Sequence, residues 1–261
     1  MTAYYNEFDP HAAQWLRNLI SAGAIAPGDV DERSIEDVRP DDLRGYTQCH
    51  FFAGIGGWAY ALDLAGWPRD RPVWTGSCPC QPFSQAGEGD GFADERHLWP
   101  AWQHLIAQCR PPVIFGEQVA SRRADSWIDL VHSDCEGMGY AFGCVAFPSA
   151  CIGAPQIRDR IYWVADSDYS GSQGYRESGW QHGSQGWADA TRHPATGGLA
   201  EWIEGRDGFS RPIEPGTRPL AHGVPGRVGK LRAYGNAIVP QQGGAFVAAY
   251  LEARPALGVV A

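Results

Sequence analysis

Two cysteines flank a proline in the turn-rich stretch TGSCPCQPFSQAG, where a thiol can do chemistry. Cys78 and Cys80 fit a metal pair, a disulfide, a redox couple, or one nucleophile beside a bystander. A structural zinc site usually needs a second close pair of Cys or His ligands, and these two alone of the seven cysteines lie that close in sequence. An odd number of cysteines without framework spacing also argues against a disulfide scaffold. The redox and nucleophile interpretations remain.

Four other motifs place polar side chains or glycines where expected strands end. HFFAGIGG is a glycine-rich turn between a strand and a helix, which suits close backbone approach by a nucleotide-like ligand. FGEQV puts Glu117 at the end of an apolar strand. QIRDR puts Gln156, Arg158 and Arg160 on one face of a strand, because side chains alternate. GNAIVP places an amide side chain just before a helix.

The composition is that of an ordinary soluble enzyme, with 44% hydrophobic and 20% charged residues. The 261 residues suffice for one large α/β domain with a small appendage, or for two modest domains. No apolar run approaches the roughly 20 residues that span a bilayer, and MTAYYNEFDPH lacks the order of a signal peptide. We therefore expect a cytoplasmic protein with reduced thiols and no membrane partner.

The net charge of −9 is unevenly distributed. Residues 1–150 hold ten basic and twenty acidic side chains, whereas residues 206–232 hold six basic and two acidic ones. A local basic stretch can contact phosphates while the whole molecule stays acidic. A solvated loop is the alternative, and charge alone favours it.

Hydrophobic patterning predicts alternating strands and helices. A β-prone run AYYNEF precedes a helix that Asp9 caps and Pro10 begins. The remaining strands are expected near 34–38 and at 46–52, 72–77, 111–119, 142–147 and 160–165, with helices at 58–66, 97–109, 126–140 and the C-terminal end of 231–253. This alternation predicts an α/β protein with a doubly wound, mostly parallel sheet.

The chain loses this periodicity after the last expected strand. From about Asp166 to Val228 it is rich in Gly, Ser, Arg, His and Trp. We therefore expect a domain at 1–165, a small irregular region at 166–230, and a loop and helix at 231–261 that return to the first domain.

Taken together, these motifs resemble those of the DNA (cytosine-5)-methyltransferase family. In family order, FFAGIGG resembles the cofactor loop, PCQPFS the nucleophile motif, GEQV the catalytic glutamate, PQIRDRIYWVA the arginine motif and YGNAIVP the C-terminal motif. They cover roughly residues 48–165 and 228–250. The resemblance implies a Rossmann-like class I fold, S-adenosyl-L-methionine as methyl donor with S-adenosyl-L-homocysteine as product, no metal, and a monomer acting on double-stranded DNA.

The resemblance also implies the catalytic roles. Cys80 would add to C6 of a flipped cytosine so that C5 becomes enamine-like. Glu117 would protonate N3, and Arg160 and Arg158 would hold the base and lower the pKa of the thiol. Gln156 belongs to the same motif, and Cys78 is then a small buried filler.

The remaining expected contacts follow from the same motifs and from the local basic charge. Cofactor contacts are expected from Glu7, Phe8, Ser34, Ile35, Phe52, Ala53, Gly54, Gly56, Gly57, Pro79, Leu98, Asn236 and Ala237. DNA contacts are expected from Gln81, Ser84, Arg206, Arg211, Arg227 and Arg232. The small 166–230 region would serve as the target-recognition region and read a short site.

The chain departs from the family at two points. Gln118 follows the glutamate, where the family usually has an asparagine that braces the nucleophile loop. Phe52 and Cys80 are only 28 residues apart, which is too few for the two cofactor strands that the family places between these motifs. Both strands have counterparts at the front of the chain, where YYNEFDPHAAQWL resembles the ribose-binding motif and DERSIEDV resembles the adenine-contacting motif.

By this match Glu7 and Phe8 would hold ribose and adenine, and Ser34, in place of a usual aspartate, would lie with Ile35 at the adenine edge. We interpret the order as a circular permutation rather than a deletion. If every helix kept its family face, the link from the FFAGIGG strand to the Pro-Cys strand would be left-handed, against a strong rule.

Other functions remain open at this stage. An RNA methyltransferase acting on transfer RNA would use the same chemistry, and a catalytically silent DNA-binding relative would keep the fold. The intact set of Cys80, Glu117 and Arg160 argues against the silent relative. The sequence does not exclude transfer of a related group, and it leaves open whether the protein is a restriction partner, a phage self-protection enzyme in an infected host cell, or a regulator.

Overall fold

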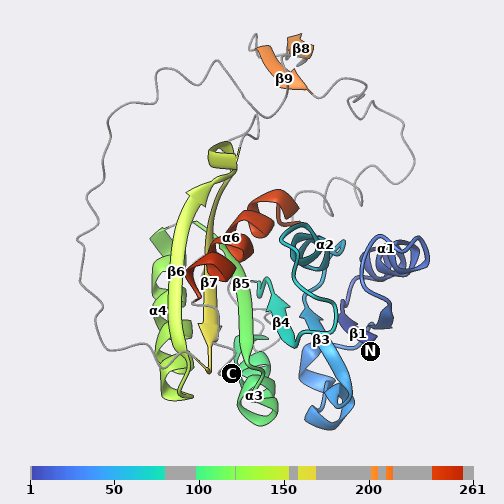
Figure 1. Ribbon diagram of the computed structural model, residues 1–261, viewed down its shortest axis with the longest axis vertical. Helices are drawn as coiled ribbons and strands as arrows, with labels where there is room; N and C mark the ends of the chain where they lie inside the picture. The colour runs from blue at the N-terminus through green and yellow to red at the C-terminus, as the bar shows by residue number, and fades with distance from the viewer. Residues whose placement is uncertain are drawn as a thin grey trace, which may run out of the picture.

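The computed structural model describes residues 2–79, 98–120, 122–152, 158–168, 201–204, 210–213 and 237–254. Its centre is a seven-stranded sheet with the order β2-β1-β3-β4-β5-β7-β6, with helices on both faces (Figure 1). The strands are β1 (Thr2–Asn6), β2 (Gly28–Asp31), β3 (Tyr46–Phe51), β4 (Val73–Gly76), β5 (Val113–Val119), β6 (Ala141–Pro148) and β7 (Asp159–Asp166). The pairs from β2 through β5 are parallel, and β7 runs antiparallel to both β5 and β6. This arrangement confirms the predicted doubly wound, mostly parallel α/β fold.

The helices form two layers. They are α1 (Pro10–Ser21), α2 (Gly57–Leu64), α3 (Leu98–Cys109), α4 (Arg122–Gly137) and α6 (Pro240–Ala253), with the 3-10 turns η1 (Ile35–Asp37), η2 (Pro40–Leu43) and η4 (Ser149–Ile152). Helices α1, α2 and α6 pack on one face of the sheet, and α3, α4, η1 and η2 pack on the other. A separate two-stranded sheet pairs β8 (Glu201–Glu204) with β9 (Ser210–Ile213). None of the helices in the described ranges has the length and apolar character needed to cross a membrane.

The first helix begins as predicted, but the second strand does not lie where the sequence suggested. Asp9 caps α1, because its Oδ1 accepts from the backbone N–H groups of His11 at 2.8 Å and Ala12 at 3.1 Å. The prediction of a strand near 34–38 is wrong, since the second strand is β2 and residues 35–37 form η1. Ser34 is the reason, because its hydroxyl accepts from the Glu36 N–H and favours a turn.

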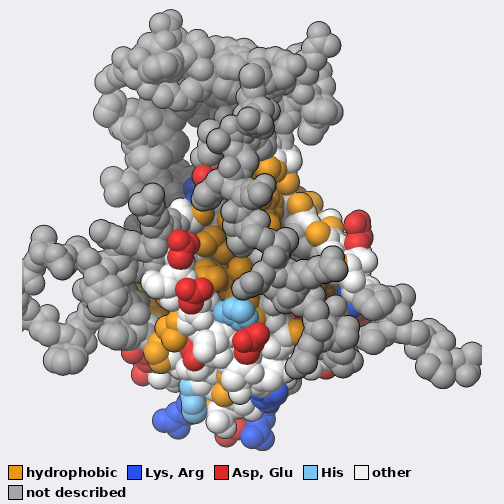
Figure 2. Space-filling model, turned by 90° about the vertical axis from the view of Figure 1, so that its left-hand side faces the viewer, with side chains coloured by type: hydrophobic (Ala, Val, Ile, Leu, Met, Phe, Trp, Pro, Cys, Tyr) orange, Lys and Arg blue, Asp and Glu red, His pale blue; other side chains and the backbone are white. Residues whose placement is uncertain are grey.

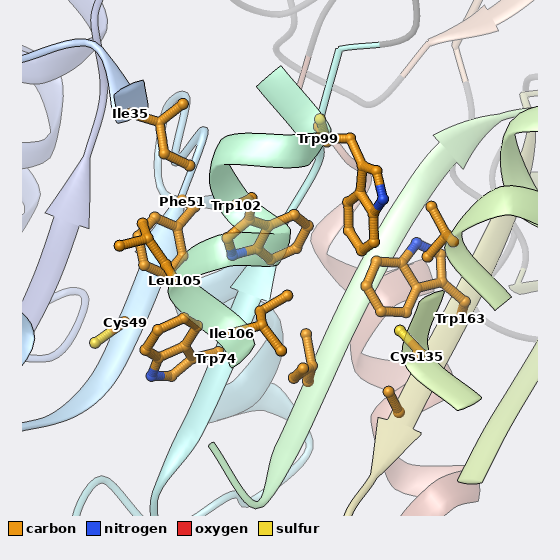
Figure 3. Close-up of a cluster of buried hydrophobic side chains, with 14 of the residues drawn as sticks. Ile35, Cys49, Phe51, Trp74, Trp99, Trp102, Leu105, Ile106, Cys135 and Trp163 are labelled. Carbon is orange, nitrogen blue, oxygen red and sulfur yellow. The ribbon is translucent and has the colours of Figure 1, made fainter. Parts of the chain in front are cut away.

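Tryptophan side chains fill the layer beneath α3 and α4 (Figure 3). Trp102 and Trp163 are fully buried, and each lies against a strand glycine. A Cβ on Gly76 would lie 2.5 Å from Trp102 Cη2, and one on Gly116 would lie 2.0 Å from Trp163 Cε2. These two glycines immediately precede Ser77 and Glu117 in the chain, so the indole packing fixes the strand ends from which both polar side chains project.

Strand β6 forms one edge of the sheet. Figure 2 faces the side of the molecule where α4 and β6 lie and shows apolar side chains among acidic ones. Leu130 in α4 is 50% exposed and Val145 in β6 is 39% exposed.

One crossover in the sheet has an unusual hand. The β1–α1–β2 and β3–α2–β4 units place their helices on the same face, yet they run in opposite directions across the sheet. The β4–α3–β5 unit runs in the same direction as β3–α2–β4 with its helix on the opposite face. The β3–α2–β4 unit therefore has the opposite hand from the other two, although about 98% of such units are right-handed. This is the left-handed link that the sequence argument expected from the motif order.

Candidate active site

The carboxyl ends of the parallel strands bring two carboxylates to one edge of the sheet, where ligands bind in open α/β folds. Glu7 follows β1, which pairs with β3 through Asn6 and Phe51. Glu117 lies near the end of β5, opposite Tyr162 of the antiparallel β7. The sheet therefore divides the candidate site into a cofactor half, around Glu7 and the glycine loop of residues 52–57, and a base half, around Glu117.

In the cofactor half, backbone N–H groups hold Glu7. The Gly54 N–H donates to Oε2 at 2.6 Å, and the Asp9 N–H donates to Oε1 at 2.9 Å. Burial raises the pKa of Glu7 above its ordinary range, although these two N–H groups oppose the rise. The carboxylate thus joins the start of α1 to the FFAGIGG loop, as the sequence match for β1 requires.

The glycine loop turns through left-handed backbone conformations. Phe52, Gly54 and Gly56 have φ values of 50°, 55° and 82°. A Cβ on Gly54 would meet nothing within 4 Å, so open space lies beside the atom that contacts Glu7. A Cβ on Gly57 would lie 2.7 Å from Ile238 Cγ1, which brings the loop before α6 against the start of α2.

The other expected cofactor residues of this half differ in exposure. Phe8 is 70% exposed beside Glu7, whereas Ile35 is 3% exposed and packs in the core under α3. Asn6 Nδ2 donates to the Arg33 carbonyl at 2.8 Å, which ties the end of β1 to the segment before Ser34. Ile35 therefore contributes to the core, while Ser34 caps η1.

In the base half, side chains hold Glu117. Arg160 Nε lies 2.6 Å from Glu117 Oε1, and both side chains are largely buried. Ser77, which follows β4, also hydrogen-bonds the carboxylate. Burial raises the pKa of Glu117, and this effect outweighs the opposing influence of Arg160, Ser77 and Arg158. A buried carboxyl of this kind can carry a proton closer to neutral pH than an exposed one.

The second arginine has a different contact. Arg158 Nη2 donates to the carbonyl of Ala237 at 2.6 Å. The arginine strand is thereby joined to the loop that precedes α6. Burial, followed by the nearby positive charge of Arg160, lowers the pKa of Arg158. The structure thus brings Arg160 to Glu117 and Arg158 to an expected cofactor residue.

The glutamine that departs from the family pattern still contacts the nucleophile loop. Gln118 Nε2 donates to the Cys78 carbonyl at 3.0 Å, and its Oε1 accepts from the Val119 N–H at 2.8 Å. The Cys78 side chain is 2% exposed and packs in the core, as a filler would. The longer amide thus fixes the backbone two residues before Cys80 in the sequence.

Several expected site residues lie outside the described ranges. Pro79 and Leu98, at either end of the undescribed segment, are half-buried, and Ala53 is buried. Only the backbone of Arg211 is described, in β9. The predicted residues outside the described ranges are Cys80, Gln81, Ser84, Gln156, Arg206, Arg227, Arg232 and Asn236. Within the described ranges, no cluster of three or more His, Cys, Asp or Glu side chains forms a metal site.

Two residues that the sequence analysis did not single out contact this site. Trp58, in the first turn of α2, donates from Nε1 to Ser77 Oγ at 3.1 Å. Ser77 itself hydrogen-bonds Glu117. The sequence signals were a tryptophan directly after the glycine loop and a serine three residues before Cys80, and neither indicates by itself that the two meet.

Comparison with known proteins finds similarity to one family over part of the chain. Residues 68–184 match the family model described as C-5 cytosine-specific DNA methylase. Type II methyltransferase M.HhaI of Haemophilus parahaemolyticus is 24% identical over 167 residues, which cover 49% of this chain and 51% of that protein. M.NlaX of Neisseria lactamica is 28% identical over 145 residues, 51% of this chain and 46% of that protein. The chain therefore spans about half the length of these relatives.

The solved structures that resemble this protein include a DNMT2 mutant of Spodoptera frugiperda. It aligns with a TM-score of 0.42 and 13% sequence identity, over 69% of this chain and 54% of that one. The S. pombe Dnmt2 methyltransferase aligns with a TM-score of 0.42 and 14% identity, over 70% and 58%.

Proposed function

We propose that this chain, whose residues 68–184 match the C-5 cytosine-specific DNA methylase model, transfers a methyl group from S-adenosyl-L-methionine to C5 of a cytosine flipped out of a short duplex DNA target. The observation that carries this proposal is the buried Glu117–Arg160 pair, at 2.6 Å. It lies on the same sheet edge as the loop held by Glu7. One edge thus offers a proton donor for a base and an acceptor for a cofactor.

The chemistry assigns one role to each side chain. The thiolate of Cys80 adds to C6 and forms an S–C6 bond while Glu117 delivers a proton to N3, so that C5 becomes enamine-like. S-adenosyl-L-methionine, when bound, would supply an electrophilic methyl group to C5 and leave as S-adenosyl-L-homocysteine. A base then removes the C5 proton, the S–C6 bond breaks, and N3 returns its proton to Glu117. Because C6 is hidden in a duplex, the cytosine must first leave the stack.

The raised pKa of Glu117 suits this role. A carboxyl with an ordinary pKa is almost fully ionised at neutral pH and has little proton to give. Burial favours the protonated form of Glu117, and Arg160 keeps the ionised form accessible after the proton has moved to N3. The pair can therefore move a proton in both directions within one catalytic cycle.

The cofactor half has the groups that a ribose and an adenine need. Each Glu7 carboxylate oxygen accepts one backbone N–H and has further lone pairs for two ribose hydroxyls. Exposed Phe8 offers a ring face beside it, and Gly54 leaves space for close approach. These residues fit S-adenosyl-L-methionine.

We also propose that the chain carries the family's cofactor strands in a changed order. β1 and β2 take the places expected for the ribose and adenine strands, next to the β3 strand that leads into the glycine loop. A circular permutation would have moved β3 to an end of the chain. Because β3 lies between β2 and β4 in the chain, the change is an exchange of two neighbouring segments, and the left-handed β3–α2–β4 unit is its consequence.

The substrate is tested by supplying both nucleic acids. The purified protein is incubated with S-adenosyl-L-methionine carrying a labelled methyl group and either duplex DNA or transfer RNA, and the nucleosides are then analysed. We expect labelled 5-methylcytosine in the duplex, within a site of roughly two to four base pairs because the recognition region is small. Label in transfer RNA alone would favour the RNA alternative, and label in neither would refute the proposal.

A further inference from the structure

A chain of two hydrogen bonds runs from the start of α2 to Glu117. Trp58 Nε1 donates to Ser77 Oγ at 3.1 Å, and Ser77 hydrogen-bonds the Glu117 carboxylate. Trp58 is 3% exposed, and its ring packs against Phe115 and Tyr162. The indole therefore has a fixed position within the apolar layer directly beneath the carboxylate.

The donor and acceptor roles in this chain are determined by chemistry. An indole N–H can only donate, so Ser77 Oγ must accept from Trp58. The hydroxyl hydrogen of Ser77 is then directed away from Trp58 and is available to Glu117. An ionised carboxylate only accepts, so the arrangement suits the ionised form of Glu117.

We propose that Ser77 is a positioning residue for Glu117, and that Trp58 holds the Ser77 hydroxyl in its donating orientation. This inference rests on the proposed methyl transfer. It assigns the serine before the Cys-Pro-Cys stretch a role in the proton transfer to N3 that Ser77 exerts through Glu117. Gln118 fixes the same loop through the Cys78 carbonyl, so β5 and α2 hold the nucleophile loop from two sides.

The pH dependence follows from the groups that face Glu117. From β7 these are Arg160, Arg158 and Tyr162, whose buried hydroxyl has no hydrogen-bond partner among the described residues. From the end of β4 the facing group is Ser77. The two arginines and Ser77 favour the ionised carboxylate against the effect of burial. Loss of the Ser77 hydroxyl should therefore raise the pKa of Glu117 further.

The chain provides matched variants for a test. Ser77→Ala removes the donor, and Ser77→Thr keeps a hydroxyl. Trp58→Phe removes the indole N–H, and Trp67→Phe removes another buried indole N–H of the same apolar cluster, one that donates to the Arg71 carbonyl. For each full-length variant we would measure kcat for methyl transfer to duplex DNA between pH 6 and 10, together with Tm.

The account predicts the following pattern. We expect Ser77→Ala to lower kcat about tenfold at neutral pH, because Glu117 is no longer held in position. The variant should also move the alkaline limb of the pH profile up by about one pH unit, since the lost hydrogen bond favoured the ionised carboxylate. Trp58→Phe moves the limb in the same direction by less, whereas Ser77→Thr and Trp67→Phe keep the wild-type profile.

Two failures are distinguishable in this experiment. If the wild-type protein methylates no DNA at any pH, the proposed function fails. If the wild-type protein is active but Ser77→Ala and Trp58→Phe keep its pH profile and lower only Tm, as Trp67→Phe would, Ser77 and Trp58 are structural residues and the inference is overturned.

Discussion

The two halves of the sheet edge each bury a carboxylate, but they hold it by different means. Glu7 accepts from the backbone N–H groups of Gly54 and Asp9. Glu117 is held by the side chains of Arg160 and Ser77. Burial raises the pKa of both groups. Main-chain donors cannot ionise or change rotamer, which suits a group that must only bind, whereas charged side chains suit a group that must release and regain a proton.

The largest expected effect comes from the carboxylate that moves a proton. Glu117→Gln keeps the shape but cannot deliver a proton to N3, so kcat for methyl transfer should fall about a hundred- to ten-thousandfold. Affinity for S-adenosyl-L-methionine should stay within about twofold, because Glu117 lies in the other half. Single-turnover rates and calorimetric titration measure the two quantities, and an unchanged rate would remove Glu117 from the chemistry.

A smaller effect is expected from the carboxylate that only binds. Glu7→Ala should weaken cofactor binding about ten- to a hundredfold, since a hydrogen bond to a charged group is worth about 1.5–3 kcal/mol. Glu7→Gln should lose nearly as much, because Gly54 and Asp9 both donate to the carboxylate and an amide offers only one acceptor oxygen. Unchanged affinity in calorimetry would remove Glu7 from the proposed cofactor site.

A third effect concerns how the free energy of unfolding depends on pH. A buried histidine with a lowered pKa makes the protein less stable as the pH falls, whereas a buried carboxyl with a raised pKa has the opposite effect. His50 Nδ1 lies 2.8 Å from Thr75 Oγ1, and burial lowers the pKa of His50 to about 3. Below its unfolded pKa of about 6.5 the unfolded chain takes up a proton that the folded protein refuses, so stability falls as pH falls. Between pH 7 and pH 5 this proton uptake should lower the free energy of unfolding by about 2 kcal/mol.

Urea unfolding at both pH values measures this contribution. The free energy of unfolding of His50→Gln should fall by about 2 kcal/mol less than that of the wild type between pH 7 and pH 5. His132→Gln, which changes a histidine that is 45% exposed, serves as the control for the loss of an imidazole. Equal losses for all three proteins would show that His50 takes up no proton on unfolding.

The smallest effect is expected from restoring the family order. A chain that reads 46–70, 1–45 and 71–261, with short linkers, keeps every strand in its place and gives the β3–α2 link the same hand as β1–α1–β2. We expect the same circular dichroism spectrum and cofactor affinity within about threefold, since no contact of Glu7 changes. A chain that folds but no longer binds the cofactor would contradict the proposed segment exchange.

Much of this architecture was predictable because local patterns determine it. Apolar periodicity located six of the seven strands of the main sheet, all but β2, and the Asp9-Pro10 pair located the start of α1. The error at 34–38 came from Ser34, whose cap favours a turn where apolar Ile35 and Val38 suggested a strand. Glu7 was expected beside the glycine loop through a match of motifs.

The contacts that complete the site were not predictable in this way. The Trp58–Ser77 bond depends on how α2 packs across β4, which no local pattern encodes. Whether Gln118 reaches the Cys78 carbonyl depends on the spacing between β5 and the loop, and the extra methylene alone left the contact undetermined. Contacts between side chains distant in sequence require the fold.

The most direct test of the account traps the proposed covalent step. Duplex DNA that contains 5-fluorocytosine is incubated with the protein and S-adenosyl-L-methionine, because fluorine at C5 prevents the proton loss that would release the enzyme. The account predicts a stable adduct that requires the methyl donor, maps by mass spectrometry to Cys80, and still forms with Cys78→Ser. An adduct at Cys78, or no adduct with DNA that the protein methylates when fluorine is absent, would contradict it.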